Sequence, residues 1–376
     1  MKDIHPLLDK EKQDQAKRYE KENRLLGLMG TLLSLVILLI FYYSGFSAFL
    51  SQIPQRGRPL ILTYLFYIAV FQISLFLLSL PLSFYSGYIH EHKWKFSNHS
   101  KKSWFLEKIK SFFVGLVLMW IVIGLLFWIW DVLPQYWWLT AGLGMVLFSV
   151  VFATIFPVVI LPIFNKYTRI ENKELTDSLE KILNKGGLRS SGFFKEDMSR
   201  QTKKENAFLA GLGRTRRVVL GDNLMDNMNV QEMTTILAHE VGHYRHRHIW
   251  KGIALGTVQQ FFVFFIVDLM MLAIFPQFLS SPQANLTLFP YFIILVSTVS
   301  GFLFGPLSQA LSRYFEKQAD RYALNISKNR KDFVSALAGI ANRNLSNAYP
   351  QRWVKILYYS HPPIGERLEL AEKVLD

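Results

Sequence analysis

Six long apolar runs are the feature that most constrains how this chain can fold. They lie near 25–44, 59–83, 111–132, 137–163, 250–275 and 286–311. Crossing roughly 30 Å of hydrocarbon as a helix takes about 20 apolar residues, so each run is long enough to span a membrane. The first run is too long for the apolar core of a signal peptide, and no small-residue cleavage site follows it. The sequence therefore predicts an all-α polytopic membrane protein with about six transmembrane helices.

The formal net charge is +14, and the basic residues are concentrated in alternate connecting segments. They precede the first run, separate the second from the third, and fill the segments after the fourth and sixth. The loop after the first run has only Arg56 and Arg58. This alternation follows the positive-inside rule and predicts that both termini and the polar segment 164–249 are cytoplasmic, at a bacterial inner membrane or a eukaryotic endomembrane. The charge is attributed to this topology and to anionic lipid, not to nucleic acid.

The chain divides into five expected parts. They are an amphipathic segment (1–24), four spans with a basic cytoplasmic loop at 84–110 (25–163), a cytoplasmic domain (164–249), two spans (250–311) and a cytoplasmic tail (312–376). Helical periodicity is expected at 172–187, 229–248, 311–327, 331–345 and 364–375. Short strands are expected within 190–199, 205–211 and 215–223, so the cytoplasmic domain is predicted to be small and α+β.

A compact metal-binding pattern lies in the helix predicted at 229–248, with Asn229 as its expected N-cap. His239 and His243 are four residues apart, which places both imidazoles on one helix face, where they can bind one ion. Glu240 follows the first histidine and can take a proton from the attacking water, then pass it to the leaving amine. The chain has no cysteine, so any metal must be held by histidine and carboxylate.

A catalytic zinc ion usually has three protein ligands, so two histidines leave the site one short. Glu316 and Asp320 are also four residues apart on a predicted helix, and either could be the third ligand. The other carboxylate could orient a zinc-bound histidine through its second ring nitrogen. The sequence therefore predicts a site for one Zn²⁺ per chain, built from two helices far apart in the chain. The first of these helices is expected to continue unbroken into the fifth span.

Several motifs, taken in order, resemble the Ste-type CAAX prenyl protease family. The match rests on "HEVGH", "RYFEKQADRYAL" and "YYSHPPIGERL", with two apolar runs between the first two. It extends to "LPIFNKYTRI", "KENAFLAGLGRTRRVVLGDNLM" and "LSLPLSFYSGYIHEHKWKF", and covers about 300 residues from roughly 75 to the C-terminus. Members of this family are integral-membrane zinc endopeptidases that remove the C-terminal tripeptide from prenylated CAAX proteins.

The resemblance implies roles for the metal-site residues. His239, His243 and Glu316 would bind zinc, and Glu240 would be the general base. Asp320 would hydrogen-bond to a zinc-bound histidine and orient it.

The resemblance also implies how substrate would be held. His361 and Arg367, in "HPPIGER", would line the active site and stabilise the oxyanion or bind the peptide carbonyl. Asn206 and Ala207, in "ENAFLAG", would belong to an edge strand that pairs with the substrate backbone. His248 lies five residues after His243 and, on a continuous helix, would point away from the metal.

One departure from the family bears on the substrate. Its eukaryotic members have seven spans, whereas six are predicted here, and the stretch before about residue 60 does not match. The leading hypothesis is a zinc endopeptidase that cleaves peptide or protein substrates at the membrane, with prenylated C-termini as candidates. The alternatives are an HtpX-like quality-control protease for membrane proteins and a non-catalytic membrane scaffold with a vestigial zinc site.

Overall fold

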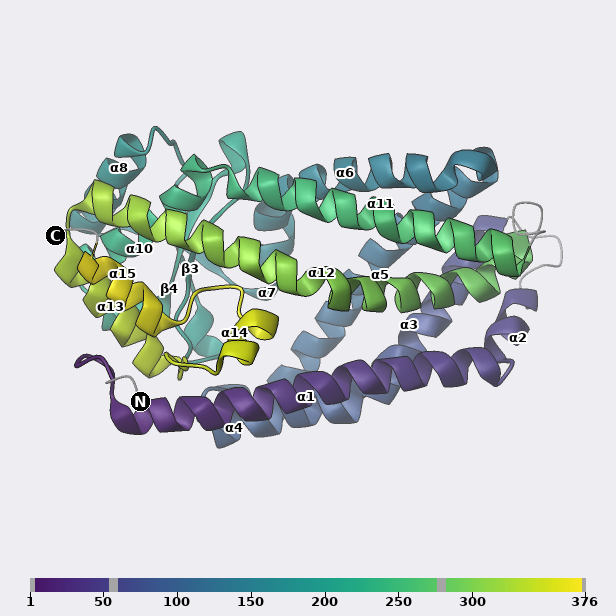
Figure 1. Ribbon diagram of the computed structural model, residues 1–376, viewed down its shortest axis with the longest axis horizontal. Coiled ribbons are helices and arrows are strands. Elements are labelled where there is room, and N and C mark those ends of the chain that lie inside the picture. The colour runs from purple at the N-terminus through teal and green to yellow at the C-terminus, as the bar shows by residue number, and fades with distance from the viewer. Residues whose placement is uncertain (1–3, 54–59, 276–281, 374–376) are drawn as a thin grey trace.

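The computed structural model describes residues 4–53, 60–275 and 282–373 (Figure 1). The loop with Arg56 and Arg58 lies outside this part. The long helices are α1 (Lys10–Tyr43), α3 (Leu60–Phe84), α5 (Lys101–Val132), α6 (Trp137–Ile155), α11 (His248–Ile274) and α12 (Pro282–Ser327). Each belongs to one of six segments that are long and apolar enough to cross a membrane, which confirms the six predicted spans.

Two of these helices, α1 and α12, include polar segments that were expected to be separate elements. The expected amphipathic segment at 1–24 is not a separate helix: from Lys10 onward it is the first part of α1, which Asp9 caps by accepting a hydrogen bond from the Lys12 amide. The helix expected at 311–327 is likewise the last part of α12, which has 46 residues. Both helices therefore join an apolar half to a polar half without a break.

Shorter helices complete the helical part. They are α2 (Phe46–Gln52), α4 (Glu91–Lys93), α7 (Leu161–Phe164), α8 (Lys173–Lys185), α9 (Asp222–Asn227), α10 (Val230–Arg245), α13 (Arg330–Arg343), α14 (Arg352–Tyr358) and α15 (Ile364–Lys373). Two π-helical turns, Tyr85–His90 and Phe156–Ile160, lead out of the second and fourth spans. Short 3-10 turns lie at Pro134–Tyr136, Met198–Arg200 and Gly213–Thr215.

A small mixed sheet lies beside α8 and α10. Its strands are β1 (Tyr167–Arg169), β2 (Phe193–Glu196), β3 (Ala207–Ala210) and β4 (Arg217–Gly221), in the order β1-β2-β4-β3. β2 and β4 are parallel, with Phe194 opposite Val219, whereas β1 and β3 pair antiparallel to their neighbours. The three predicted strands are confirmed. β1 was not expected, because three residues are too short to show a periodic pattern.

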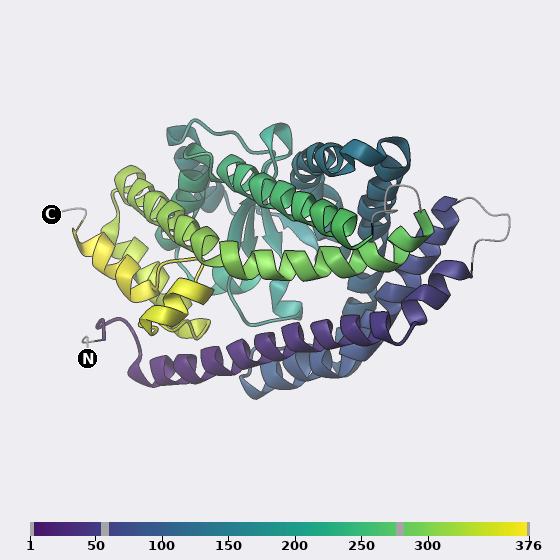
Figure 2. The same cartoon turned by 45° about the vertical axis from the view of Figure 1, so that its right-hand side comes forward.

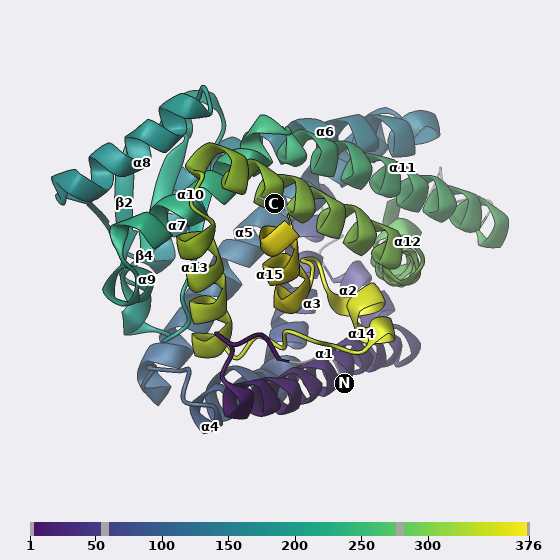
Figure 3. The same cartoon turned by 60° about the vertical axis from the view of Figure 1, so that its left-hand side comes forward.

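The molecule has two apolar cores, one for each half. One lies among the membrane-spanning helices and is rich in aromatic side chains, including Tyr64, Phe127 and Trp137. The other fills the domain formed by the sheet, α8, α10, α13 and α15. Seen from the end where the chain termini lie, α10, α12, α13 and α15 are grouped together (Figure 3). In another view, α1 runs along the opposite side of the molecule from α10 and α11 (Figure 2).

The predicted continuity between the metal-binding helix and the fifth span is wrong. α10 ends at Arg245, and α11 begins at His248. Arg247 between them has φ 57°, in the left-handed region that residues other than glycine rarely adopt. A left-handed residue cannot continue a right-handed helix, so the chain changes direction here and the two helices have separate axes.

Candidate active site

The helix α10 is fixed at its start by the expected cap. The Asn229 side chain accepts a hydrogen bond from the Glu232 amide (2.8 Å), and the Glu232 carboxylate accepts one from the Asn229 amide (3.0 Å). This reciprocal capping satisfies two backbone donors that a helix start otherwise leaves unpaired. The apolar face of α10, including Leu237 and Val241, is buried in the core of the sheet domain. The opposite face therefore presents its polar side chains to α12.

His239, His243 and Glu316 converge in one place. Their ligand atoms lie within 4.8 Å of one another. The two Nε2 atoms of the histidines are 3.1 Å apart, and each is 3.2 Å from an oxygen of Glu316. Of the two carboxylates that the sequence left as alternatives, Glu316 lies at this point.

These donors fit a zinc ion. Two neutral imidazole nitrogens and a carboxylate are a common ligand set for catalytic zinc. The buried Glu316 Oε2 makes no hydrogen bond, although it lies 3.2 Å from His239 Nε2. Lone-pair atoms that converge in this way are satisfied by a cation.

Asp320 and Arg367 lie on the Nδ1 side of the His239 ring, opposite the nitrogen that faces Glu316. His239 Nδ1 lies 2.8 Å from Asp320 Oδ1, so its other nitrogen is left for the metal. Arg367 donates to both oxygens of Asp320, at 2.6 and 2.9 Å, and all three residues are buried. Burial alone would lower the pKa of His239, but the neighbouring carboxylates of Asp320 and Glu316 raise the pKa to about 9. Each ring nitrogen thus faces a carboxylate, Nδ1 that of Asp320 and Nε2 that of Glu316.

Gly242, between the two histidines, allows α12 to pack closely against α10. A Cβ on Gly242 would lie 2.8 Å from the Cα of Ala319 and 3.0 Å from its carbonyl oxygen. Both contacts are to backbone, which cannot yield as a flexible side chain could. Sequence reasoning did not single out Gly242, although a glycine inside a predicted helix, where it costs stability, was a signal of close packing.

Two cavities adjoin the metal site. One of about 280 Å³ is lined by His243, Leu209 and Glu316, among others. The other, of about 930 Å³, extends from His239 to α1. Half-buried Glu240 lines both cavities, so a base at this position can reach a bound peptide from the metal side.

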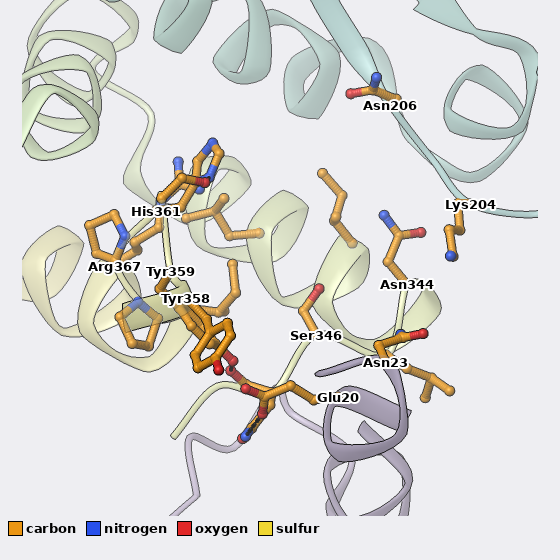
Figure 4. A pocket seen from close by; sticks show the side chains of 18 of the residues that line it. Glu20, Asn23, Lys204, Asn206, Asn344, Ser346, Tyr358, Tyr359, His361 and Arg367 are labelled. Atoms are coloured by element: carbon orange, nitrogen blue, oxygen red, sulfur yellow. Dashed lines mark hydrogen bonds between the residues drawn. The ribbon is translucent and has the colours of Figure 1, made fainter. Parts of the chain in front are cut away.

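The large cavity brings together segments far apart in the chain (Figure 4). Glu20 and Asn23 of α1 lie across it from His361 and Arg367, and Asn206 lies on a third side. The exposed His361 ring places its Nε2 3.2 Å from Glu316. Arg367 also lines the cavity, but its Nε and Nη2 donate to Asp320.

Asn206 and Ala207 lie at the expected sheet edge. β3 pairs with β4 alone among the described strands, with Ala207 opposite Leu220. The Asn206 carbonyl accepts a hydrogen bond from the Gly221 amide (2.9 Å), which extends this pairing by one residue. The other side of β3 is the one a peptide could join, and Ala207 and Leu209 each line one of the two cavities.

Two family models match nearly the whole chain. Residues 2–166 match the CAAX prenyl protease N-terminal model, which is described as having five membrane helices, and residues 169–375 match peptidase family M48. The expectation that the stretch before about residue 60 does not match the family is therefore wrong. Among the described residues, four candidate spans lie within 2–166.

Known proteins agree with these matches. The uncharacterized metalloprotease YhfN of Bacillus subtilis is 28% identical, over 95% of this chain and 85% of that protein. CAAX prenyl protease 1 of Saccharomyces cerevisiae is 30% identical, over 79% of this chain and 69% of that protein. The crystal structure of S. mikatae Ste24p has the same fold, with a TM-score of 0.86 at 23% identity, and the match covers 98% of this chain and 90% of that chain. This multi-pass membrane protein therefore belongs to peptidase family M48, the metalloproteases that include the CAAX prenyl proteases.

Proposed function

We propose that this metalloprotease is a zinc-dependent endopeptidase that cleaves peptide bonds near the lipidated C-termini of membrane-associated chains. The observation that carries the proposal is the convergence of His239, His243 and Glu316 beside Glu240, at one end of a cavity that reaches α1. Similarity to proteins named CAAX prenyl proteases supports the choice of substrate class. We propose that His239, His243 and Glu316 hold one Zn²⁺.

The chain's own residues account for the remaining chemistry. A bound zinc ion would supply Lewis acidity, which polarises the scissile carbonyl and makes water a nucleophile near neutral pH. Glu240 takes the proton of the attacking water and returns it to the leaving amine, so the group that leaves is a neutral amine. His361 donates a hydrogen bond to the carbonyl oxygen as negative charge develops on it. Arg367 contributes through Asp320: it donates to both carboxylate oxygens, and Asp320 Oδ1 lies 2.8 Å from His239 Nδ1.

An extended peptide would bind along β3. Its main chain would add to the free edge at Asn206 and Ala207, which gives affinity with little dependence on side chains. Because Ala207 and Leu209 of β3 line the same two cavities as Glu240, a peptide paired with β3 would lie beside this base. Leu28 and Phe302 line the same large cavity, with 48% and 68% of their surface exposed. These apolar side chains would contact the hydrocarbon of a lipidated substrate.

The active site is proposed to open to the cytoplasm. Both chain ends and the sheet lie at one end of the long axis (Figure 1). The segments at this end are those in which the basic residues of the sequence are concentrated. By the positive-inside rule, this end would be cytoplasmic, where anionic headgroups attract it.

Peptide cleavage followed by mass spectrometry tests the proposal. The purified protein would be incubated with a farnesylated C-terminal peptide, the same peptide without lipid, and an unmodified fragment of a membrane protein. We expect cleavage near the C-terminus of the farnesylated peptide, inhibition by a zinc chelator, and faster turnover than for the unmodified peptide. Preferred cleavage of the membrane-protein fragment would instead indicate a quality-control protease.

Glu240→Gln is the matched variant for this experiment. It removes the base but keeps the size of the side chain, so zinc should stay bound while turnover falls by about 10²–10⁴-fold. Bound zinc can be measured by elemental analysis of the same sample. Undiminished cleavage by this variant would contradict the assignment of the base. Stoichiometric zinc in wild-type protein that hydrolyses none of the three peptides would instead indicate a non-catalytic scaffold.

A further inference from the structure

We propose that His248 is a positioning residue that orients the metal-facing ring of His243, an inference that rests on the proposed zinc site. His248 Nδ1 lies 3.0 Å from His243 Nδ1, the ring nitrogen opposite the one that faces Glu316. His248 is buried, with 5% of its surface exposed. It does not belong to the group of converging metal-ligand atoms. Its contact is therefore with the ligand and not with the metal.

The break between α10 and α11 is what brings His248 to this position. On a continuous helix of 3.6 residues per turn, a residue five positions later lies about 140° around the axis. His248 would then point away from the metal side, as the sequence suggested. The left-handed Arg247 (φ 57°) reverses this direction, and His248 returns toward His243 as the first residue of α11. A strained residue at this point is thus coupled to the position of a metal ligand.

The hydrogen-bond directions along this chain of side chains are consistent with zinc binding. The amide nitrogen of Gln318 donates to the Tyr314 hydroxyl (3.2 Å), so its carbonyl oxygen faces His248 Nε2 at 3.0 Å. A carbonyl oxygen only accepts, so His248 Nε2 is the donor and Nδ1 of the neutral ring is the acceptor. His243 Nδ1 must then carry the hydrogen, which leaves the Nε2 lone pair of His243 free to face the metal.

The two zinc histidines are therefore held differently. His239 is held by a carboxylate that is itself paired with Arg367. His243 is held by a neutral imidazole, whose other nitrogen is bound to an amide. A partner on the second nitrogen fixes both the tautomer and the plane of a ligand ring. Without His248, the ring of His243, with 24% of its side chain exposed, would keep only its metal-side contacts.

His248 also packs against aromatic rings, so its hydrogen bond must be separated from its packing. Its ring stacks on Phe315, with centroids 4.4 Å apart, and on His246 at 5.5 Å. His248→Phe keeps a flat ring for this stacking but removes both nitrogens. His248→Asn loses the ring but places an acceptor oxygen close to the position of Nδ1. If His248 acts through its hydrogen bond, His248→Phe should weaken zinc binding and His248→Asn should not. If it acts through ring packing, the reverse is expected.

Zinc affinity is the measurement, made by competition with a coloured chelator on the full-length protein in detergent. We expect His248→Phe to bind zinc about 10–100-fold more weakly, the usual cost of losing a partner of a ligand histidine. His248→Asn should remain within a few-fold of wild type. The matched control is His246→Phe, because His246 stacks on the same ring without a hydrogen bond to either zinc histidine, and it should have no effect.

Cobalt substitution gives a second readout. The visible absorption of bound Co²⁺ should change in His248→Phe and stay unchanged in His246→Phe, because only the first alters a ligand's orientation. Wild-type affinity in His248→Phe, or equal loss in both His248 variants, would overturn the proposal.

A third variant tests the proposal independently if His248→Phe does not fold. Gln318→Met removes the acceptor that fixes the tautomer of His248, and should weaken zinc binding several-fold; unchanged affinity would overturn the proposal. If the wild-type protein itself binds no zinc, the proposed function fails as well. If it binds zinc and the variants match it, this inference fails alone.

Discussion

At the scale of single residues, Asp320 connects a metal-ligand histidine to a buried arginine. It accepts hydrogen bonds from Arg367 and contacts His239, and it is fully buried. Two charged groups are stable in this interior only because they neutralise each other and because their polar atoms are paired. The carboxylate therefore supports both folding and the orientation of a ligand.

Removing this carboxylate should cost stability as well as metal affinity. We expect Asp320→Ala to lower the free energy of unfolding by about 3–5 kcal/mol, because the buried Arg367 is left without a counter-charge. Thermal denaturation followed by tryptophan fluorescence measures the effect. The control is Glu366→Ala, which breaks the ion pair of Glu366 with Lys355, where both side chains are about a third exposed, and which should cost under about 1 kcal/mol. Equal losses in the two variants would contradict the special role of Asp320.

At the scale of elements, the site depends on how closely α10 and α12 approach. Gly242→Ala should force the helices apart, because the added methyl meets the backbone of Ala319. Overpacking of this kind costs about 1–3 kcal/mol, and here it should also weaken zinc binding by moving Glu316 and Asp320. Gly256→Ala on α11 is the control, since a Cβ there meets nothing within 4 Å. Zinc titration and thermal denaturation of both variants test the expectation.

The helix α1 should act on substrate binding more than on the chemical step. Arg24 lines the large cavity, where its guanidinium stacks on Trp353 (5.1 Å) and lies 3.7 Å from Glu20. Arg24 keeps 22% of its side chain exposed at this cavity, so a peptide carbonyl could accept a hydrogen bond from it. Arg24→Met should therefore raise KM by about tenfold or more while kcat stays close to wild type.

The control for this variant lies on the same helix. Lys17 pairs with Asp14, and both side chains are more than half exposed, so Lys17→Met should leave KM unchanged. A fall in kcat without a change in KM in Arg24→Met would instead place Arg24 in the catalytic step.

At the scale of the whole molecule, the proposed metal would join two helical segments that stand before and after the last two membrane spans in the sequence. His239 and His243 come from α10, whereas Glu316 comes from α12 after the sixth span. Because zinc binds the folded state, removing it with a chelator should lower stability, by about 2.7 kcal/mol relative to protein with free zinc at 100 times its Kd. The melting temperature should return when zinc is added back, but not with magnesium. A melting temperature insensitive to chelation would contradict this coupling.

Much of this architecture could be predicted from the sequence, and what could not has physical reasons. The spans follow from the length of their apolar runs, and the two histidines follow from helical spacing. The bond of Arg367 to Asp320 joins residues 47 positions apart, and no local pattern reports such a contact. The break at Arg247 was also hidden, because neither glycine nor proline marks it and the neighbouring residues favour a continuous helix.

The length of α12 gives the bilayer itself a way to act on the active site. A helix of 46 residues extends roughly 70 Å at 1.5 Å per residue, and Glu316 lies near one end of it while its other half lies in the apolar region. A span that is too long or too short for the surrounding lipid changes its tilt. Because Glu316 lies far along α12 from the apolar region, a small change in tilt would move its carboxylate relative to α10. Turnover should therefore vary with acyl-chain length in reconstituted vesicles, because membrane thickness would affect the geometry of the active site.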